Sequence, residues 1–296
     1  MATDARVHDV TGFWQRQATN RKVHQLFGYA VVTFLAVLYA VPFLWMISTS
    51  LKPPWDLDNV PPNLIPTVFS PENYPNSLFK PTRYFPTFFR NTLVYVGLTV
   101  VGQVLSCSLV AYGFARIPFK GNKFLFSLVL STMMLPAQVL LIPQYLLFKQ
   151  LGWLDSLLPL VVPQYFGTAF YIFLLRQFFM TIPREIDEAA LVDGANYLDI
   201  FWRILLPLCR PILITVFALS FVAHWNDFFG PLIYLNGRER MVVAVALRLF
   251  LQPGMQLPIH ELMAASVTTL IPVIAVFFFC QRAFVRGITM TGLKEG

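Results

Sequence analysis

Charged residues are scarce in this sequence. Asp, Glu, Lys and Arg together make up 12% of the 296 residues, whereas a soluble domain carries roughly 25%. Hydrophobic residues make up 56%, and the mean hydropathy is +0.61. So few charges cannot cover the surface of a soluble protein of this size, and so much apolar content excludes intrinsic disorder. The composition therefore indicates an integral membrane protein.

Cysteine and histidine are also rare. Cys107, Cys209 and Cys280 lie in or beside apolar stretches without CxxC spacing, which excludes a disulfide-stapled secreted module and is typical of buried thiols. Only four histidines occur, and the segment that begins His260-Glu261 lacks the second histidine of the H-E-x-x-H zinc motif. No G-x-S-x-G nucleophile motif is present. We therefore expect no metal, cofactor or catalytic site on this chain.

Long apolar runs dominate what remains. A helix needs about 20 predominantly apolar residues to cross a bilayer, and six stretches meet this requirement: 27–47, 92–114, 124–148, 157–179, 211–235 and 263–281. The predicted fold is an all-α integral membrane protein with six transmembrane helices. The chain then divides into an N-terminal arm (1–25), a first transmembrane helix (26–48), a loop (49–91), a helical core (92–284) and a C-terminal tail (285–296).

The distribution of Lys and Arg predicts the orientation. Most of these residues fall in the arm, the tail and the loops that share their side of the membrane, so both termini are expected in the cytoplasm. There is no basic block or basic recognition helix, so nucleic acid is not an expected partner. The long 49–91 loop is then external. It is rich in proline and aromatic residues, which denies it long helices and favours packing against the membrane or a partner.

The cytoplasmic segment 181–210 carries the clearest local signals. Pro183 suits the first turn of a helix, and Gly194 is placed to end that helix in the left-handed conformation. Asn196 is able to cap a second helix, with Asp199 three residues on. The pattern predicts two short helices joined by a glycine elbow.

These two helices have small and apolar faces. The first brings Ile186, Ala189, Ala190 and Asp193 to one side, and the second offers an apolar stripe formed by Tyr197, Ile200, Phe201 and Ile204. Such a pair suits two roles, a connector on the bilayer surface or a plug for a groove on a soluble partner. The residues alone leave both roles open.

One motif in this segment resembles a known family. The pattern EAA-x3-G-x9-I-x-LP is matched without departure by Glu188, Ala189, Ala190, Gly194, Ile204, Leu206 and Pro207. It is similar to the EAA loop of permease subunits in binding-protein-dependent ABC importers. Further segments resemble the carbohydrate-uptake permeases of the maltose-importer type: Ser50-Leu-Lys-Pro53, Glu72-Asn-Tyr74, Asn91-Thr-Leu93, Gly113-Phe-Ala-Arg116 and Trp225-Asn226-Asp227-Phe-Phe-Gly-Pro231.

This resemblance implies a type I ABC importer transmembrane fold and a mechanism. The EAA loop would dock, as a coupling helix, into a cleft on a separate ATPase subunit in the cytoplasm of a prokaryotic cell. The implied partners are a second permease subunit, two ATPase subunits, an external solute-binding protein and a carbohydrate substrate. ATP and magnesium would bind the ATPase, because the P-loop pattern G-x-x-x-x-G-K-[ST] is absent from this chain. The C-terminal tail would insert between the ATPase subunits.

Polar residues within the fifth span offer two interpretations. His224, Trp225, Asn226 and Asp227 would line a translocation path, with hydrogen bonds to sugar hydroxyls and the indole stacked on a sugar face. Alternatively Asp227 pairs with an arginine or caps a helix break near Gly230-Pro231. A secondary transporter or membrane enzyme that uses His224 and Asp227 as a proton relay is the competing class of function.

Other polar side chains follow closely on prolines that kink their helices. The candidate path residues of this kind are Gln138, Gln144, Gln164 and Tyr165. A kink frees a backbone carbonyl and exposes polar groups to a water-filled path. Hydrogen bonding between helices explains the same residues equally well.

Overall fold

The computed structural model describes residues 4–59, 61, 63–80, 84–252 and 257–292, with the side chains of 4–23, 137 and 283–292 left out. Within these ranges the chain forms helices and turns and no strand. Four helices are long and apolar enough to cross a membrane: His24–Ser50, Phe85–Arg116, Leu158–Phe179 and Ile259–Arg282. The number rises to six if two bent pairs of helices each count as one span. The all-helical membrane class is confirmed, and the exact count of six spans stays a prediction.

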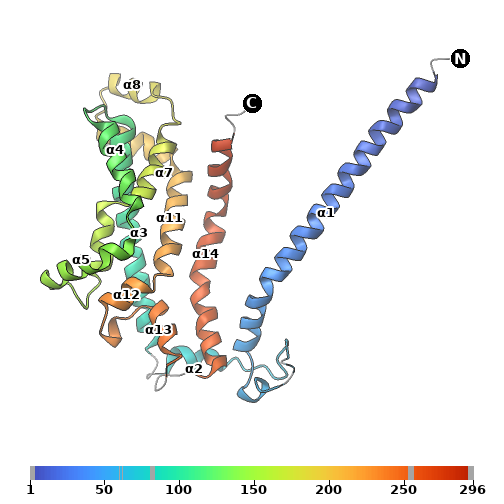
Figure 1. The fold of residues 1–296 in the computed structure, drawn as a ribbon, viewed down its shortest axis with the longest axis vertical. Coiled ribbons are helices and arrows are strands. Elements are labelled where there is room, and N and C mark those ends of the chain that lie inside the picture. Colours follow the sequence, from blue (N-terminus) through green and yellow to red (C-terminus); the bar gives the residue numbers. More distant parts are fainter. Residues whose placement is uncertain (1–3, 60, 62, 81–83, 253–256, 293–296) are drawn as a thin grey trace.

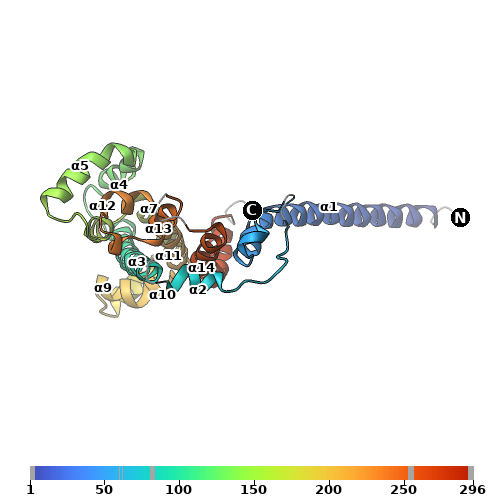
Figure 2. The same cartoon turned by 90° about the horizontal axis from the view of Figure 1, so that it is seen from below.

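Helix α1 (Asp4–Ser50) combines the predicted arm and the first span in one 47-residue helix. Its span runs apart from most of the remaining helices (Figures 1 and 2) and meets α14 (Ile259–Gly292) near its C-terminal end. There Ser50 also contacts the short α2 (Asn73–Phe79). The apolar side chains of the span are exposed, with Leu26 at 71% and Tyr39 at 72%. Such a surface requires lipid or another membrane protein as its neighbour.

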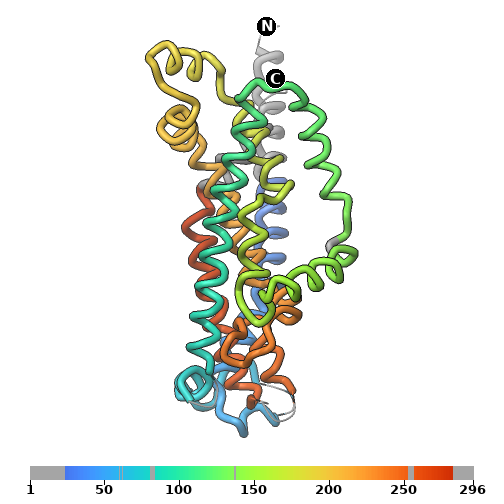
Figure 3. Tube along the Cα trace, turned by 90° about the vertical axis from the view of Figure 1, so that its left-hand side faces the viewer, coloured from blue at the N-terminus to red at the C-terminus, as the bar shows by residue number. Residues whose placement is uncertain are grey.

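A bundle of four helices forms the centre of the molecule (Figure 3). It consists of α3 (Phe85–Arg116), α7 (Ala169–Phe179), α11 (Arg210–Trp225) and α14 (Ile259–Gly292). Helix α3 packs against both α7 and α11, and α11 packs against α14. The fully buried side chains of Tyr95, Leu175, Phe179 and Val216 lie in the two clusters that hold these helices together.

The second span begins earlier than the sequence predicts. Helix α3 starts at Phe85, with Pro86 in its first turn, whereas the hydropathy pattern placed the start at Thr92. Proline is compatible with a first turn because its missing N–H would have no partner there. The predicted 49–91 loop is shorter by the same amount.

The external loop is folded around two of the motifs that resemble the family. It contains η1 (Pro54–Asp56) and α2 (Asn73–Phe79). The amide of Asn73 donates to the backbone oxygens of Ser50 (3.0 Å) and Lys52 (2.8 Å), and the hydroxyls of Ser50 and Tyr74 lie 2.9 Å apart. The Ser50–Pro53 segment and the Glu72–Tyr74 segment therefore fix each other.

The third predicted span, 124–148, is not one continuous helix. Helix α4 (Asn122–Ser131) and η3 (Thr132–Met134) form one limb, and α5 (Ala137–Gln150) forms the other. The limbs meet at a bend of 99°. Pro136 lies at this bend, where it holds the preceding residue in an extended conformation and offers no N–H for a helical hydrogen bond.

The fourth and fifth predicted spans are interrupted as well. Helices α6 (Leu158–Val161) and η4 (Val162–Phe166) precede α7, with Gly167 at φ +87° in the break. The predicted span 211–235 breaks after Trp225, where α11 ends, and continues in α12 (Phe229–Tyr234). Two short elements, η6 (Arg238–Arg240) and α13 (Val243–Leu249), lead to α14.

Candidate functional site

The 181–210 loop lies at one end of the helix bundle, opposite α2 and the external loop (Figure 1). Its first helix is α8 (Glu185–Val192), with three acidic residues in the first turn. The acidic side chains favour helix formation there because the N-terminus of a helix carries partial positive charge. The predicted pair of short helices is present.

Gly194 forms the elbow between the two limbs. Its φ of +87° is accessible to glycine at little cost. The N–H of Gly194 donates to the oxygen of Leu191 (3.1 Å), and the N–H of Ala195 donates to that of Ala190 (2.9 Å). These two bonds form a complete Schellman motif. A Cβ at Gly194 would meet no atom within 4 Å, so the requirement is backbone conformation and not space.

The second limb starts with a capping box. The Asn196 side chain accepts from the N–H of Asp199 (2.9 Å), and the Asp199 carboxylate accepts from the N–H of Asn196 (3.4 Å). Helix α9 (Tyr197–Asp199) continues as the π-helical η5 (Ile200–Leu205) and α10 (Leu206–Leu208). The chain then turns by 80° into α11, next to two prolines, Pro207 and Pro211, that lack the N–H of a continuous helix.

Helix α3 anchors the loop to the bundle. The Arg116 guanidinium donates to the oxygens of Phe179 (2.8 Å) and Ile182 (2.9 Å) and pairs with the Asp187 carboxylate at 3.1 Å. One turn away, the Tyr112 hydroxyl donates to the oxygen of Tyr197 at 2.9 Å. Both limbs are thus tied to the same helix.

The EAA motif residues divide between surface and core. Glu188 and Ala189 are exposed and Ala190 is buried. Of the remaining motif residues, Ile204 and Leu206 are half-buried and Pro207 is exposed. Several apolar side chains of the loop face outward: Ile186, Leu191, Val192, Tyr197, Leu198 and Trp202. The predicted stripe on the second limb is wrong in part, because Ile200 and Phe201 are buried against the bundle while Leu198 and Trp202 take the outer face.

A second group of polar residues lies inside the bundle, centred on Gln103 of α3. Its amide nitrogen donates to Gln164 (2.9 Å) and Thr168 (2.6 Å). Its amide oxygen accepts from Ser220 (2.5 Å) and faces His224 Nε2 at 3.2 Å. Gln103 therefore joins α3, α11 and the break before α7, and its side chain is 2% exposed.

Asp227 lies beyond the end of α11 and not on one helical face with His224. Its Oδ1 accepts from the N–H of Gly230 (3.2 Å), and its Oδ2 accepts from the Tyr95 hydroxyl (2.8 Å). The Tyr95 hydroxyl also lies 3.3 Å from His224 Nδ1. The bond to Gly230 is the kind of contact that the capping interpretation of Asp227 expects at this break, and the described residues show no arginine paired with Asp227.

The other candidate path residues occupy different environments. Trp225 is 3% exposed, stacks on Phe221 at 5.4 Å and donates to the oxygen of Thr269 (3.2 Å). Asn226, Gln138 and Gln144 are exposed. Gln164 is half-buried in the Gln103 network, whereas Tyr165 is 45% exposed, lies against Gly102 and donates to the oxygen of Leu98 (3.1 Å).

Sequence reasoning missed four of the residues that organise these sites. Arg116 and Asp187 carried no pairing signal, because they are far apart in the chain. Gln103 and Tyr95 lie within a long apolar stretch. Gln103 could have been identified, because an isolated amide side chain in the middle of a membrane-spanning helix is a signal of function. Among the described residues, no group of three or more His, Cys, Asp or Glu could hold a metal ion. The predicted tail includes 285–292, which continue the backbone of α14, and 293–296, which lie outside the described residues.

Comparisons with known proteins agree with this architecture. Residues 104–290 match the family described as "Binding-protein-dependent transport system inner membrane component". The chain is 34% identical over 262 residues to the arabinooligosaccharides transport system permease protein AraQ of Bacillus subtilis, covering 88% of this chain and 92% of AraQ. It is 31% identical to the trehalose/maltose transport system permease protein MalG of Thermococcus litoralis, covering 88% and 93%.

The fold also matches a solved structure. A chain of the crystal structure of a bacterial ABC transporter involved in the import of the acidic polysaccharide alginate superposes with a TM-score of 0.77 at 24% identity, covering 88% of this chain and 96% of that one. The family match includes the 181–210 loop and the Gln103 network's partners on α11. This protein therefore belongs to the family of inner membrane components of binding-protein-dependent transport systems.

Proposed function

We propose that this chain is the permease subunit of an ATP-driven importer for a carbohydrate, and that the 181–210 loop couples it to a separate ATPase. The observation that carries the proposal is the loop itself. Its EAA helix α8 stands at the end of the bundle, ends in the Schellman turn at Gly194 and is tied to α3 through Arg116 and Asp187. The second limb starts with the capping box at Asn196 and is tied to α3 through Tyr112. A stiff, well-anchored element with an exposed apolar face suits the transmission of force from a soluble partner.

Relatives support the substrate class. AraQ is named for arabinooligosaccharides and MalG of Thermococcus litoralis for trehalose and maltose. An oligosaccharide or a related polyol is therefore the proposed cargo. The exposed side chains of Gln138, Tyr165 and Asn226 are the candidates for path contacts, and His224, Asp227 and Gln164 support them from the bundle. Trp225 is proposed to position Asn226 and Asp227 through its packing.

The assembly we propose contains this chain, a second permease subunit, two ATPase subunits carrying ATP and magnesium, and an external solute-binding protein. The apolar surface of the α1 span supports a neighbour in the membrane. The ends of the first and last spans that lead to the termini lie at the same end as α8 (Figure 1), and the bias of Lys and Arg supports a cytoplasmic location for that end.

Co-purification tests this proposal. The chain is tagged, extracted in mild detergent and analysed by mass spectrometry for the proteins that accompany it. We expect a second multi-span permease and an ATPase with a P-loop, at two ATPase copies per permease pair. A chain that purifies alone, or only with copies of itself, would contradict the proposal.

A proton-coupled transporter is the second candidate, since the Tyr95 hydroxyl lies between His224 and Asp227. The two candidates differ in which residues are essential. The importer requires the 181–210 loop, whereas the relay requires His224 and Asp227.

A further inference from the structure

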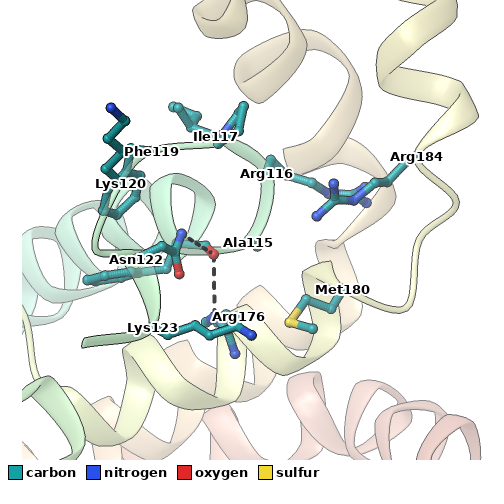
Figure 4. Close-up of a pocket in the computed structure, with 12 residues that line it drawn as sticks. Ala115, Arg116, Ile117, Phe119, Lys120, Asn122, Lys123, Arg176, Met180 and Arg184 are labelled. Atoms are coloured by element: carbon teal, nitrogen blue, oxygen red, sulfur yellow. Dashed lines mark hydrogen bonds between the residues drawn. The ribbon is translucent and has the colours of Figure 1, made fainter. Parts of the chain in front are cut away.

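A cavity of about 500 Å³ lies at the same end of the bundle as α8 (Figure 4). Its walls come from the end of α3, the following turn, the start of α4 and the end of α7. Five of its lining residues are basic and none is acidic. The basic ones are Arg116, Lys120, Lys123, Arg176 and Arg184.

Only one of these five cations has a carboxylate partner in the described part of the chain. Arg116 pairs with Asp187 at 3.1 Å. For the other four the structure shows no ion pair among the described residues. Lys120, Lys123 and Arg184 are exposed and Arg176 is half-buried. Four uncompensated positive charges around one concavity produce a local potential that favours an anion.

Arg176 is held in place before any ligand binds. Its Nε donates to the backbone oxygen of Phe114 (3.4 Å), and its guanidinium lies 4.1 Å from the centre of the Phe126 ring. The Asn122 amide donates to the same oxygen at 3.1 Å, as the dashed lines in Figure 4 show. This arrangement uses Nε and leaves the two Nη groups for a ligand, which reduces the entropy that binding would cost.

The backbone adds positive potential. Helix α4 begins at Asn122 on the cavity wall. Its N–H bonds to the oxygen of Phe119, whereas the N–H of Lys123 donates to no backbone oxygen in the described chain. The first turn of a helix attracts anions, and phosphate above all, through such groups and the helix dipole.

We propose that this cavity binds a phosphate-bearing anion, with the phosphodiester headgroup of an anionic lipid as its source. Planar guanidinium groups and free N–H groups match phosphate oxygens well. Two apolar lining residues are themselves exposed beside these charges, Phe119 at 40% and Met180 at 52%, and they form a small apolar surface. This surface supplies a place for acyl chains, which a soluble phosphate would not need. Basic pockets between helix ends recognise lipid headgroups in this way.

Lipid binding is measured on the full-length chain, purified with the subunits that accompany it and placed in phosphatidylcholine nanodiscs with a titrated fraction of phosphatidylglycerol. Native mass spectrometry gives the phosphatidylglycerol retained. The variant Lys120→Gln/Lys123→Gln removes two exposed charges and is expected to fold. It should weaken phosphatidylglycerol binding by about tenfold or more, since each cation near a phosphate contributes roughly 1 kcal/mol. Arg176→Gln removes one cation and should weaken it by about fivefold.

The matched control is Arg203→Gln, an exposed charge at the same end of the molecule but outside the cavity. It should leave phosphatidylglycerol binding within about twofold of wild type, because it removes no cavity charge. Equal lipid retention in the wild type, the cavity variants and this control would overturn the proposal.

A second arm identifies the source of the phosphate. Binding of inorganic phosphate is followed by phosphorus NMR in discs of phosphatidylcholine alone. Saturable phosphate binding that the cavity variants lose, without any preference for phosphatidylglycerol, would assign the cavity to a soluble anion and overturn the lipid assignment. Neither arm needs transport, so the result stands whether or not the proposed function holds.

Discussion

The 181–210 loop and the Gln103 network hold their polar residues by opposite means. In the loop, backbone devices fix the shape: a Schellman turn at Gly194 and a capping box at Asn196 leave Glu188 exposed. In the network, side chains fix one another, and Gln103 and Ser220 are almost fully buried. The difference supports the proposal that the loop presents its outer face to a partner, whereas the network joins helices of the bundle to each other.

The largest effect is expected from Gly194→Glu. A side chain at φ +87° costs about 1–2 kcal/mol, and it places a carboxylate on the face proposed to dock. Uptake of the labelled substrate should fall to about a tenth of wild type or less, with normal amounts of protein in the membrane. The control is Gly152→Glu, which imposes similar strain at φ +69° with open space around it, and it should retain most uptake. Equal losses in both variants would mean that strain, and not the loop, explains the effect.

Removing the anchor of the loop should have the next largest effect. Arg116→Gln leaves the Asp187 carboxylate unpaired and two backbone oxygens without donors. A loss of about 2–3 kcal/mol is expected, because the Arg116 side chain is 3% exposed and that of Asp187 is 17% exposed. Thermal unfolding of the purified protein measures it. Asp187→Asn, which keeps an acceptor for Arg116, should be clearly milder, and the reverse order would contradict the anchor.

The role of Gln103 in joining the residues of the network is tested by the substitution Gln103→Leu. This change leaves Ser220, Thr168 and His224 without a partner that they now share. A destabilisation of about 1–3 kcal/mol is expected for buried polar groups that lose their partner, measured as a lower unfolding temperature. Gln144→Leu is the control, because Gln144 is exposed on α5, and it should leave that temperature unchanged.

A smaller effect is expected from His224→Ala combined with Asp227→Asn. An amide at position 227 keeps the oxygen that caps Gly230, so destabilisation should stay near 1 kcal/mol and uptake above about a third of wild type. Radiolabelled uptake at equal membrane protein levels measures this. If the double variant lost all uptake while Gly194→Glu kept normal uptake, the result would favour the proton relay instead.

The smallest effect concerns Asp155, at the end of the bundle opposite the loop. N–H groups of Gly237 and Asn236 and the guanidinium of Arg240 hold the pKa of the Asp155 carboxyl below its usual range. A carboxyl with a lowered pKa stabilises the fold above its ordinary pKa, near 4, and loses this contribution as the pH falls through the lowered value. Asp155→Asn should therefore lower the unfolding temperature slightly at pH 7, and this difference should shrink as the pH falls below about 4. A difference that persists in acid would contradict this.

Much of the fold was predictable because apolar length is a direct physical signal. The spans within α1 and α14 were located within a few residues. The bends were less predictable. Pro136 marks the 99° bend, yet proline within an apolar run also occurs inside α5 at Pro143 without ending that helix. Which proline breaks a helix depends on packing that the local sequence does not contain.

In the candidate sites, too, features set by the local sequence were predictable and features set by packing between distant segments were not. Gly194 and Asn196 act through their own backbone and were assigned correctly from local chemistry. Arg116 and Gln103 act on residues 61 or more positions away, and nothing in the local pattern names such partners. The burial of part of the predicted stripe has the same origin, since Phe201 packs against Tyr112 of α3, and Ile200 is fully buried as well.

The most direct test of the central claim places a photo-crosslinking amino acid at Val192, which is 87% exposed on α8. The same amino acid at Val139, 64% exposed on α5, is the control. Membranes from cells that express the whole transport system are irradiated, and the crosslinked partner is identified by mass spectrometry. We expect position 192 to crosslink to a P-loop ATPase and position 139 not to do so. Crosslinks from position 192 to lipid alone would contradict coupling through the 181–210 loop.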